Sequence, residues 1–272
     1  MALFLTPSTP TELRNLANLC VKTYRYEEAK DALIHAIAMD SSDSKAYLSL
    51  GIVHCFTKRF ADAETSLKQA IAIAPLDLSA LSELIIIYRN QGSIDLTLMQ
   101  CEIGLAIEPL NPILHIYRSL IRLSSFELST GWSEYQWRFY STDPIVKRLH
   151  QDLHPWDGYS NDRPLVVWRE QGIGDVIFHL GFLPQLETLH PDIILDINPR
   201  LRIIASRSFP SLTVADSDCL SSICSDYYEV PIASLGMHLG ASLEMARKRP
   251  AQYLFADAEK VKHFRDELTY NR

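Results

Sequence analysis

Apolar and small residues recur with a fixed period through the N-terminal half of the chain. When the sequence is shifted by 34 residues, like residues fall on one another: Ala29 on Ala63, Leu33 on Leu67, Ala36 on Ala70, Leu16 on Leu50 and Leu84, and Pro75 on Pro109. A repeat of this length predicts stacked pairs of helices. We expect units over about residues 10–43, 44–77 and 78–111, with a degenerate fourth unit over about 112–145.

The repeated unit resembles the tetratricopeptide hairpin. Leu50 and Gly51 match the Leu-Gly pair of its first helix, Ala63 matches the small residue of its second helix, and Pro75 closes the unit. Gly51 and Ala63 are small where the two helices cross closely, so larger side chains can fill the space around the crossing. Because one hairpin cannot bury its apolar face alone, three or more units predict a short superhelix with a concave surface.

That concave surface predicts a protein or peptide partner. Tetratricopeptide domains that grip the C-termini of chaperones use basic and Asn side chains on the first helices of successive units. Arg14 and Asn18 resemble the first pair of such a clamp, whereas Ser49, Ser79 and Glu83 replace the residues that would complete it. Arg14 and Asn18 are therefore interpreted as a solvated face, and a different peptide or protein surface remains open.

After about residue 160, short β-rich runs alternate with helical stretches. This pattern predicts βαβ units around a mostly parallel sheet. The expected strands are residues 165–168, 193–197, 212–214 and 227–230, and the expected helices are 175–188, 199–208, 234–246 and 257–268. The predicted fold class is α + α/β: a tetratricopeptide solenoid over residues 1–145, followed by a Rossmann-like α/β lobe over residues 146–272.

Charge and composition narrow the possible functions. With 26 Lys and Arg against 33 Asp and Glu, the net charge is −7, which disfavours a nucleic-acid partner. No stretch approaches the roughly 20 apolar residues of a membrane span, and the N-terminus does not resemble a signal peptide, so a cytoplasmic location is expected. The five cysteines lack the spacing of a zinc site or a disulfide scaffold. We expect reduced thiols and no metal.

A glycine-rich loop follows the first predicted strand. Its residues Glu170, Gln171, Gly172, Gly174 and Asp175 lie between that strand and an apolar-periodic helix. A strand–loop–helix junction of this kind favours anions or sugar hydroxyls at the carboxyl edge of a sheet. The same residues also fit a tight turn that needs positive φ at a glycine, with Asp175 as an ordinary helix N-cap.

Flanking motifs place this loop in a wider pattern. In order, the chain carries GWSEYQWR at 131–138, HPWDG at 154–158, EQGIGD at 170–175, NPRL at 198–201 and SRSFP at 206–210. This series resembles bacterial tetratricopeptide proteins whose C-terminal part is similar to the family 9, heptosyltransferase-like glycosyltransferases. The resemblance covers about residues 10–268, and EQGIGD is its most specific element.

The resemblance implies a two-lobed GT-B glycosyltransferase. The N-terminal lobe would bind a glycan or protein acceptor, and the C-terminal lobe would bind a nucleotide-sugar donor, with no other cofactor. Asp175 carries over as the general base that takes the proton of the acceptor hydroxyl, although a helix N-terminus lowers its basicity. We expect contacts to substrate from the rest of the loop and the helix after it: Glu170, Gln171, Gly172, Gly174 and His179.

Several residues depart from that family pattern. Relatives carry an Arg-Tyr pair where this chain has Gly181 and Phe182, so a cation that could meet a phosphate is missing. His179 either forms an acid/base pair with Asp175 or makes an ordinary i,i+4 contact, and the contact is the favoured interpretation. Three tryptophans either stack on sugars or pack at a domain seam, and packing is favoured: Trp132, Trp137 and Trp156.

The length of the chain bears on the choice between the two main hypotheses for its function. A GT-B enzyme needs a second α/β lobe, and the chain ends at Arg272 near the helix that would lead into it, so we expect the donor lobe to be absent. The first hypothesis is a glycosyltransferase-like protein for hexosyl or heptosyl transfer, inactive as an isolated chain. The alternative is a non-catalytic tetratricopeptide interaction module capped by an α/β domain. A nucleotide-binding regulator ranks behind both.

Overall fold

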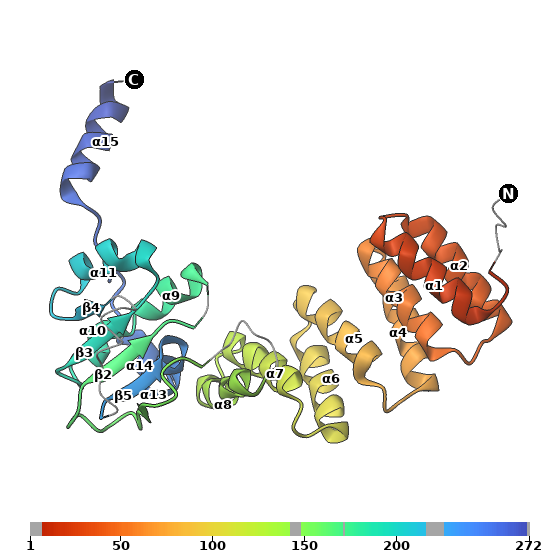
Figure 1. The fold of residues 1–272 in the computed structure, drawn as a ribbon, viewed down its shortest axis with the longest axis horizontal. Helices are drawn as coiled ribbons and strands as arrows, with labels where there is room; N and C mark the ends of the chain where they lie inside the picture. The colour runs from red at the N-terminus through yellow and green to blue at the C-terminus, as the bar shows by residue number, and fades with distance from the viewer. Residues whose placement is uncertain (1–6, 142–147, 171, 216–225, 271–272) are drawn as a thin grey trace. The chain divides into compact units, whose positions relative to one another are not determined.

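The computed structural model describes residues 7–141, 148–170, 172–215 and 226–270. The chain forms two compact units, Met1–Ile121 and Arg122–Arg272, whose helices and strands are drawn in Figure 1. Among the described residues, the first unit contains three clusters of buried apolar residues and the second unit contains one. The first unit is a solenoid of tetratricopeptide-like helical hairpins, and the second contains a small parallel sheet.

The helices of the solenoid keep a strict period. They are α1 (Pro10–Lys22), α2 (Tyr26–Met39), α3 (Ser44–Phe56), α4 (Phe60–Ile73), α5 (Leu78–Asn90), α6 (Ile94–Ile107) and α7 (Pro112–Ser124), whose end belongs to the second unit. First helices begin at residues 10, 44, 78 and 112, and second helices begin at 26, 60 and 94. Within each of these two sets, successive helices therefore begin 34 residues apart. The predicted repeat is confirmed.

Local sequence signals explain these starts and turns. The residue before each first helix caps it, because its side-chain oxygen accepts a backbone N–H of the first turn: Thr9, Asp43, Asp77 and Asn111. The turn inside each hairpin needs one residue in the left-handed region, with φ between 59° and 71°: Tyr24, Lys58, Gly92 and Phe126. Caps and turns therefore repeat with the same period as the core residues.

The crossing inside the second hairpin is tightly filled. Ala63 on α4 is completely buried, and a Cβ added to Gly51 on α3 would lie 2.6 Å from Cγ of Leu67. This separation is far below van der Waals contact, so only glycine fits at position 51 without movement of its neighbours. The small residues that predicted a close crossing do lie at one.

The sheet of the second unit has five parallel strands. They are β1 (His154–Pro155), β2 (Leu165–Trp168), β3 (Ile193–Asp196), β4 (Thr213–Ala215) and β5 (Tyr228–Pro231), in the spatial order β1-β5-β2-β3-β4. Four of them match the predicted strands to within one residue at each end. β1 was not predicted, because a two-residue edge strand leaves no alternating pattern in the sequence.

Apart from a last helix of 13 residues, the helices described in the second unit have eight residues or fewer. The described helices of this unit are α8 (Leu128–Glu134), η1 (Tyr135–Tyr140), α9 (Ile173–Leu180), α10 (Leu183–Leu186), η3 (Pro199–Leu201), α11 (Arg202–Ser208), η4 (Ile232–Ser234), α13 (Leu235–Leu239), α14 (Leu243–Arg247) and α15 (Ala258–Tyr270). The continuous helices predicted over 175–188 and 234–246 are wrong. Gly181 ends α9 and Gly240 ends α13, because glycine is a poor helix former and a good helix terminator.

The degenerate fourth repeat is divided differently from the prediction. Its second helix, α8, belongs to the second unit, whereas the repeat pattern predicted a boundary between residues 145 and 146. The physical reason is packing between α8 and α13, since a Cβ added to Gly236 would lie 2.4 Å from Cε2 of Trp132. Trp132 thus joins the core beneath the sheet rather than the core of the solenoid.

Candidate functional site

The glycine-rich loop connects β2 to α9. Gly172 occupies the N-cap position of α9 with a φ of −62°, and Asp175 is the third residue of the helix. Among described glycines, positive φ occurs at Gly92 and Gly158, so the tight-turn interpretation of this loop is wrong, and so is the N-cap role of Asp175. Gln171 lies outside the described residues.

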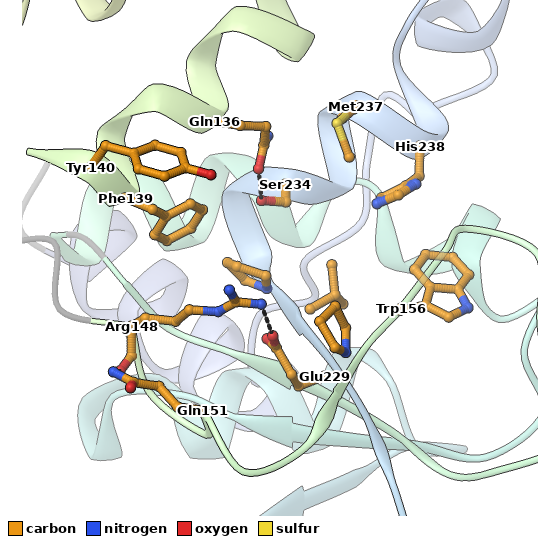
Figure 2. A pocket seen from close by; sticks show the side chains of 13 residues that line it. Gln136, Phe139, Tyr140, Arg148, Gln151, Trp156, Glu229, Ser234, Met237 and His238 are labelled. Atoms are coloured by element: carbon orange, nitrogen blue, oxygen red, sulfur yellow. Dashed lines mark hydrogen bonds and ion pairs between the residues drawn. The ribbon is translucent and has the colours of Figure 1, made fainter. Parts of the chain in front are cut away.

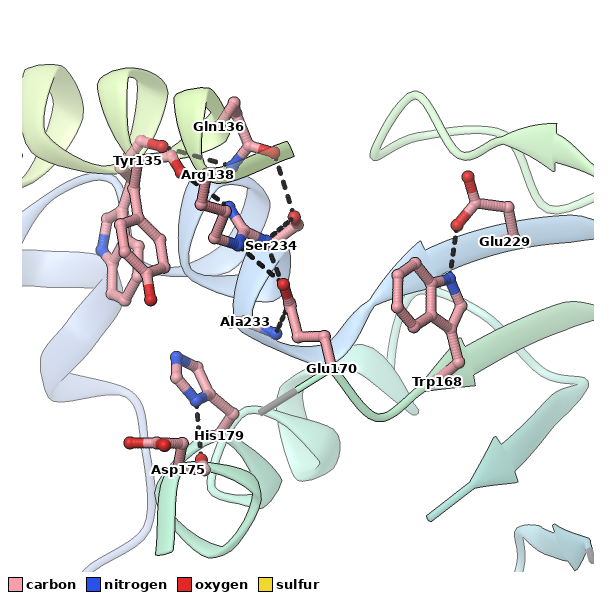
Figure 3. Close-up of polar contacts among 11 residues, drawn as sticks. Tyr135, Gln136, Arg138, Trp168, Glu170, Asp175, His179, Glu229, Ala233 and Ser234 are labelled. Carbon is pink, nitrogen blue, oxygen red and sulfur yellow. Dashed lines mark hydrogen bonds and ion pairs between the residues drawn. The ribbon is translucent and has the colours of Figure 1, made fainter. Parts of the chain in front are cut away.

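Glu170 is held inside the second unit by a buried ion pair. Its carboxylate accepts hydrogen bonds from Nε and Nη2 of Arg138 at 2.7 and 2.9 Å, and from the backbone N–H of Ala233 at 3.0 Å (Figure 3). The exposed fractions of the Arg138 and Glu170 side chains are 2% and 0%. Arg138 also donates to Oγ of Ser234 at 2.7 Å. The network ties the loop to η1 and η4, and the substrate contact expected of Glu170 stays a prediction.

His179 and Asp175 do not form a side-chain pair. The Nδ1 atom of His179 lies 2.7 Å from the backbone oxygen of Asp175, and its Nε2 atom is buried without a partner in the described structure. Burial lowers the pKa of His179, so the ring is neutral at neutral pH. The carboxylate of Asp175 is exposed and points away from the ring (Figure 3). The structure thus contains an i,i+4 contact to the backbone.

A cation from elsewhere in the chain lies beside Gly181 and Phe182, the two residues that replace the Arg-Tyr pair of the family pattern. Arg249, from the segment after α14, donates from Nη2 to the backbone oxygen of Phe178 at 2.6 Å. Its guanidinium carbon lies 4.3 Å from the ring centroid of Phe182, and a Cβ added to Gly181 would lie 2.3 Å from Nη2. Sequence reasoning missed Arg249 because it lies far along the chain and no motif includes it.

The tryptophans of the flanking motifs contribute to packing. Trp132 and Trp156 are buried in the core of the second unit, and Nε1 of Trp156 donates to the backbone oxygen of Ser160 at 2.8 Å. Trp137 lies against Tyr140 with a centroid separation of 5.4 Å. These positions agree with the packing interpretation, although Trp156 also lines a pocket.

That pocket has a volume of about 420 Å³ and lies within the second unit (Figure 2). At its floor, the buried carboxylate of Glu229 accepts from Nη2 of Arg148 and from Nε1 of Trp168, both at 2.5 Å. Trp156 and Tyr140 contribute aromatic walls. No described residue of the glycine-rich loop lines it, so the site predicted from sequence and this pocket are different places. Glu229 carried no sequence signal.

A second candidate surface lies on the first helices of the solenoid, which line the inner face of a tetratricopeptide stack. Positions 34 residues apart on α3, α5 and α7 carry Ile52, Ile86 and Leu120, each of them partly or largely exposed. The equivalent residue on α1 is the exposed Asn18. Arg14 lies 2.8 Å through its Nε from Oδ2 of Asp43, so its charge is already paired within the first unit. At this repeat position the inner face is polar on α1 and apolar on α3, α5 and α7.

The described residues hold no group of three or more His, Cys, Asp or Glu side chains placed to bind a metal. Cys20, Cys55 and Cys101 form no disulfide, while Cys219 and Cys224 lie outside the described residues. Within the same residues, none of the helices combines the length and the apolar character needed to cross a membrane.

Comparison with known proteins matches only part of the chain. No protein-family model and no curated protein matches the sequence. Similar solved structures include MamA 41-end from Desulfovibrio magneticus RS-1, with 18% identity, 51% of this chain and 78% of that chain covered, and a TM-score of 0.46. They also include YrrB, a TPR protein with an unusual peptide-binding site, with 17% identity, 49% of this chain and 69% of that chain covered, and a TM-score of 0.43. A third is the first TPR of Spaghetti (RPAP3) bound to an HSP90 peptide, with 20% identity, 43% of this chain and 95% of that chain covered, and a TM-score of 0.41. The repeat assignment rests on the spacing of helices and caps in the chain itself.

Proposed function

We propose that the chain is a tetratricopeptide protein-interaction module that binds a peptide segment of a partner protein on its first helices. The observation that carries this proposal is the row formed by Ile52, Ile86 and Leu120, one residue on each of three successive first helices. Partly exposed apolar side chains at the same position of three successive helices are typical of a binding surface rather than of a solvated one.

Further exposed side chains extend the same surface. Phe56 on α3 is 53% exposed and Ile113 on α7 is 50% exposed. A solvated inner face would carry polar residues at these positions, as α1 does at the equivalent Lys22 and Thr11, which are both exposed. The second unit follows the solenoid and, in this proposal, has no catalytic role.

The test is a selection of random displayed peptides on the full chain. We expect Ile86→Asn to weaken the binding of the enriched peptides by about tenfold or more, which is ~1.4 kcal/mol or more of binding free energy. Ile103→Asn is the matched control, because Ile103 is an exposed isoleucine on the second helix α6. Unfolding midpoints of both variants are compared first. Equal affinity of the two folded variants would contradict the proposal.

A glycosyltransferase-like role is the second candidate, and one observation favours it. The exposed carboxylate of Asp175 lies in the first turn of the helix that follows β2, and β2 has β3 on one side and β5 on the other. In parallel α/β sheets, ligands bind at the carboxyl ends of strands where the chain changes direction in this way. Asp175 would act as the base toward an acceptor hydroxyl, with a nucleotide sugar as donor, in a Rossmann-like half of a GT-B fold.

Sugar transfer from nucleotide-sugar donors, measured with the chain joined to a donor-binding α/β lobe, tests this candidate. Asp175→Asn is expected to lower turnover by about 10²- to 10⁴-fold through loss of the general base. Stability should change by no more than about 0.5 kcal/mol, because the carboxylate is exposed and caps nothing. Asp266→Asn on α15 is the control for an exposed helix carboxylate. Full turnover by Asp175→Asn, in an extended chain whose unmodified form transfers sugar, would remove the candidate.

A further inference from the structure

A single carboxylate interrupts the apolar inner face. Glu83 lies on α5 three residues before Ile86, so the two side chains share one face of the helix. Residues at the equivalent position of the neighbouring first helices are Ser49 on α3 and Tyr117 on α7, both partly exposed. Glu83 is therefore flanked by the row of apolar side chains and by uncharged neighbours.

Glu83 has no counter-ion in the described structure. It makes no hydrogen bond or ion pair there, although its side chain is partly buried. Burial alone raises the pKa of Glu83, and no cation offsets that effect. Arg89, the one cation of α5, has its guanidinium carbon 5.2 Å from the ring centroid of Tyr117. The pKa of the Cys55 thiol on α3 is raised by burial and, to a smaller extent, by the charge of Glu83.

The unpaired carboxylate of Glu83 lowers the stability of the free chain and becomes favourable only when a bound partner pairs with it. A partly desolvated carboxylate without a donor loses hydration and gains nothing in return. A cation from a ligand would restore that interaction through a charge-assisted hydrogen bond, while apolar ligand side chains cover the surrounding row. The same carboxylate would repel an acidic C-terminal tail of the kind that a basic clamp holds.

We infer that Glu83 determines specificity on this face, and that the bound segment carries a Lys or Arg flanked by apolar side chains. The inference rests on the proposed peptide-binding function and names the chemistry of its partner. The net charge of −7 acts in the same direction, because it attracts basic segments to the chain as a whole.

The test starts from peptides enriched on the full chain from a random displayed library. We expect a Lys or Arg at a fixed position among apolar residues, and about tenfold weaker binding of these peptides by Glu83→Lys. Glu102→Lys is the matched control, because Glu102 is an exposed glutamate on the second helix α6. Replacing the peptide's basic residue by Glu should restore binding to Glu83→Lys and abolish it with the unmodified chain.

Each other outcome overturns the inference in a recognisable way. Enriched peptides that depend on Ile86 but lack a basic residue, or that bind Glu83→Lys normally, contradict the role of Glu83 and leave the proposed function intact. Failure to enrich any peptide contradicts the proposed function and the inference with it. An independent measurement uses the unliganded chain: Glu83→Gln should raise the unfolding midpoint at neutral pH, whereas a lowered midpoint would show that Glu83 serves the fold.

Discussion

Arg138→Met is expected to lower the free energy of unfolding of the second unit by about 3–5 kcal/mol. The substitution leaves the carboxylate of Glu170, which has no exposed surface, without its bidentate partner. Breaking a buried pair from one side is costly because the remaining charge stays desolvated and unpaired. Urea unfolding, followed by the fluorescence of Trp168 and its neighbours in this unit, measures the change.

The double variant Arg138→Met with Glu170→Met separates pairing from packing. Removing both charges eliminates the unpaired ion, so the double variant should recover most of the stability that the single variant loses. Lys248→Met serves as the surface control, since the Lys248–Glu244 pair at 3.7 Å is exposed and should contribute no more than about 1 kcal/mol. A double variant as unstable as Arg138→Met would show that the long Arg138 side chain stabilises the unit through packing.

This ion pair shows why the site was harder to predict than the fold. Position 138 is equivalent to Ala36, Ala70 and Gly104 in the earlier repeats, where small residues allow helices to approach. The repeat pattern therefore gave no reason to join position 138 to Glu170. Glu170 was assigned to substrate because it opens a recognisable loop, and the sequence does not reveal a partner 32 residues away.

Elements set by local chemistry were predicted well. Helix starts follow from caps and periodic apolar residues, and β2 follows from a run of four buried residues, so both are visible within a few residues of sequence. The predictions fail for elements whose bounds depend on packing against residues far away in the sequence. The helix expected over 175–188 breaks at Gly181, which lies against Arg249, and the second helix of the fourth repeat packs under α13.

For the candidate sites, the sequence indicated which residues to consider but not where their side chains point. The spacing of Asp175 and His179 was consistent with a side-chain pair, yet the histidine bonds to the backbone and the carboxylate faces solvent. The repeat register, in contrast, gave the inner face directly once the helices were placed, because Ile52 and Ile86 are equivalent by position. Glu83 was noted as a departure from a basic clamp, and its lack of a counter-ion required the structure.

Ala63→Trp is the second change with a large expected effect on stability, and it acts on the solenoid. Ala63 is completely buried, and the crossing it lines has no free volume, since a Cβ at Gly51 would already lie 3.4 Å from the Ala63 oxygen and 2.6 Å from Cγ of Leu67. An indole can enter only if α3 and α4 separate, so we expect a loss of about 1–3 kcal/mol or more in the free energy of unfolding. Lys68→Gln, on the exposed face of α4, should change it by less than about 0.5 kcal/mol. An unaltered unfolding midpoint for Ala63→Trp, in a variant that unfolds reversibly, would mean that the hairpin crossing does not exist as described.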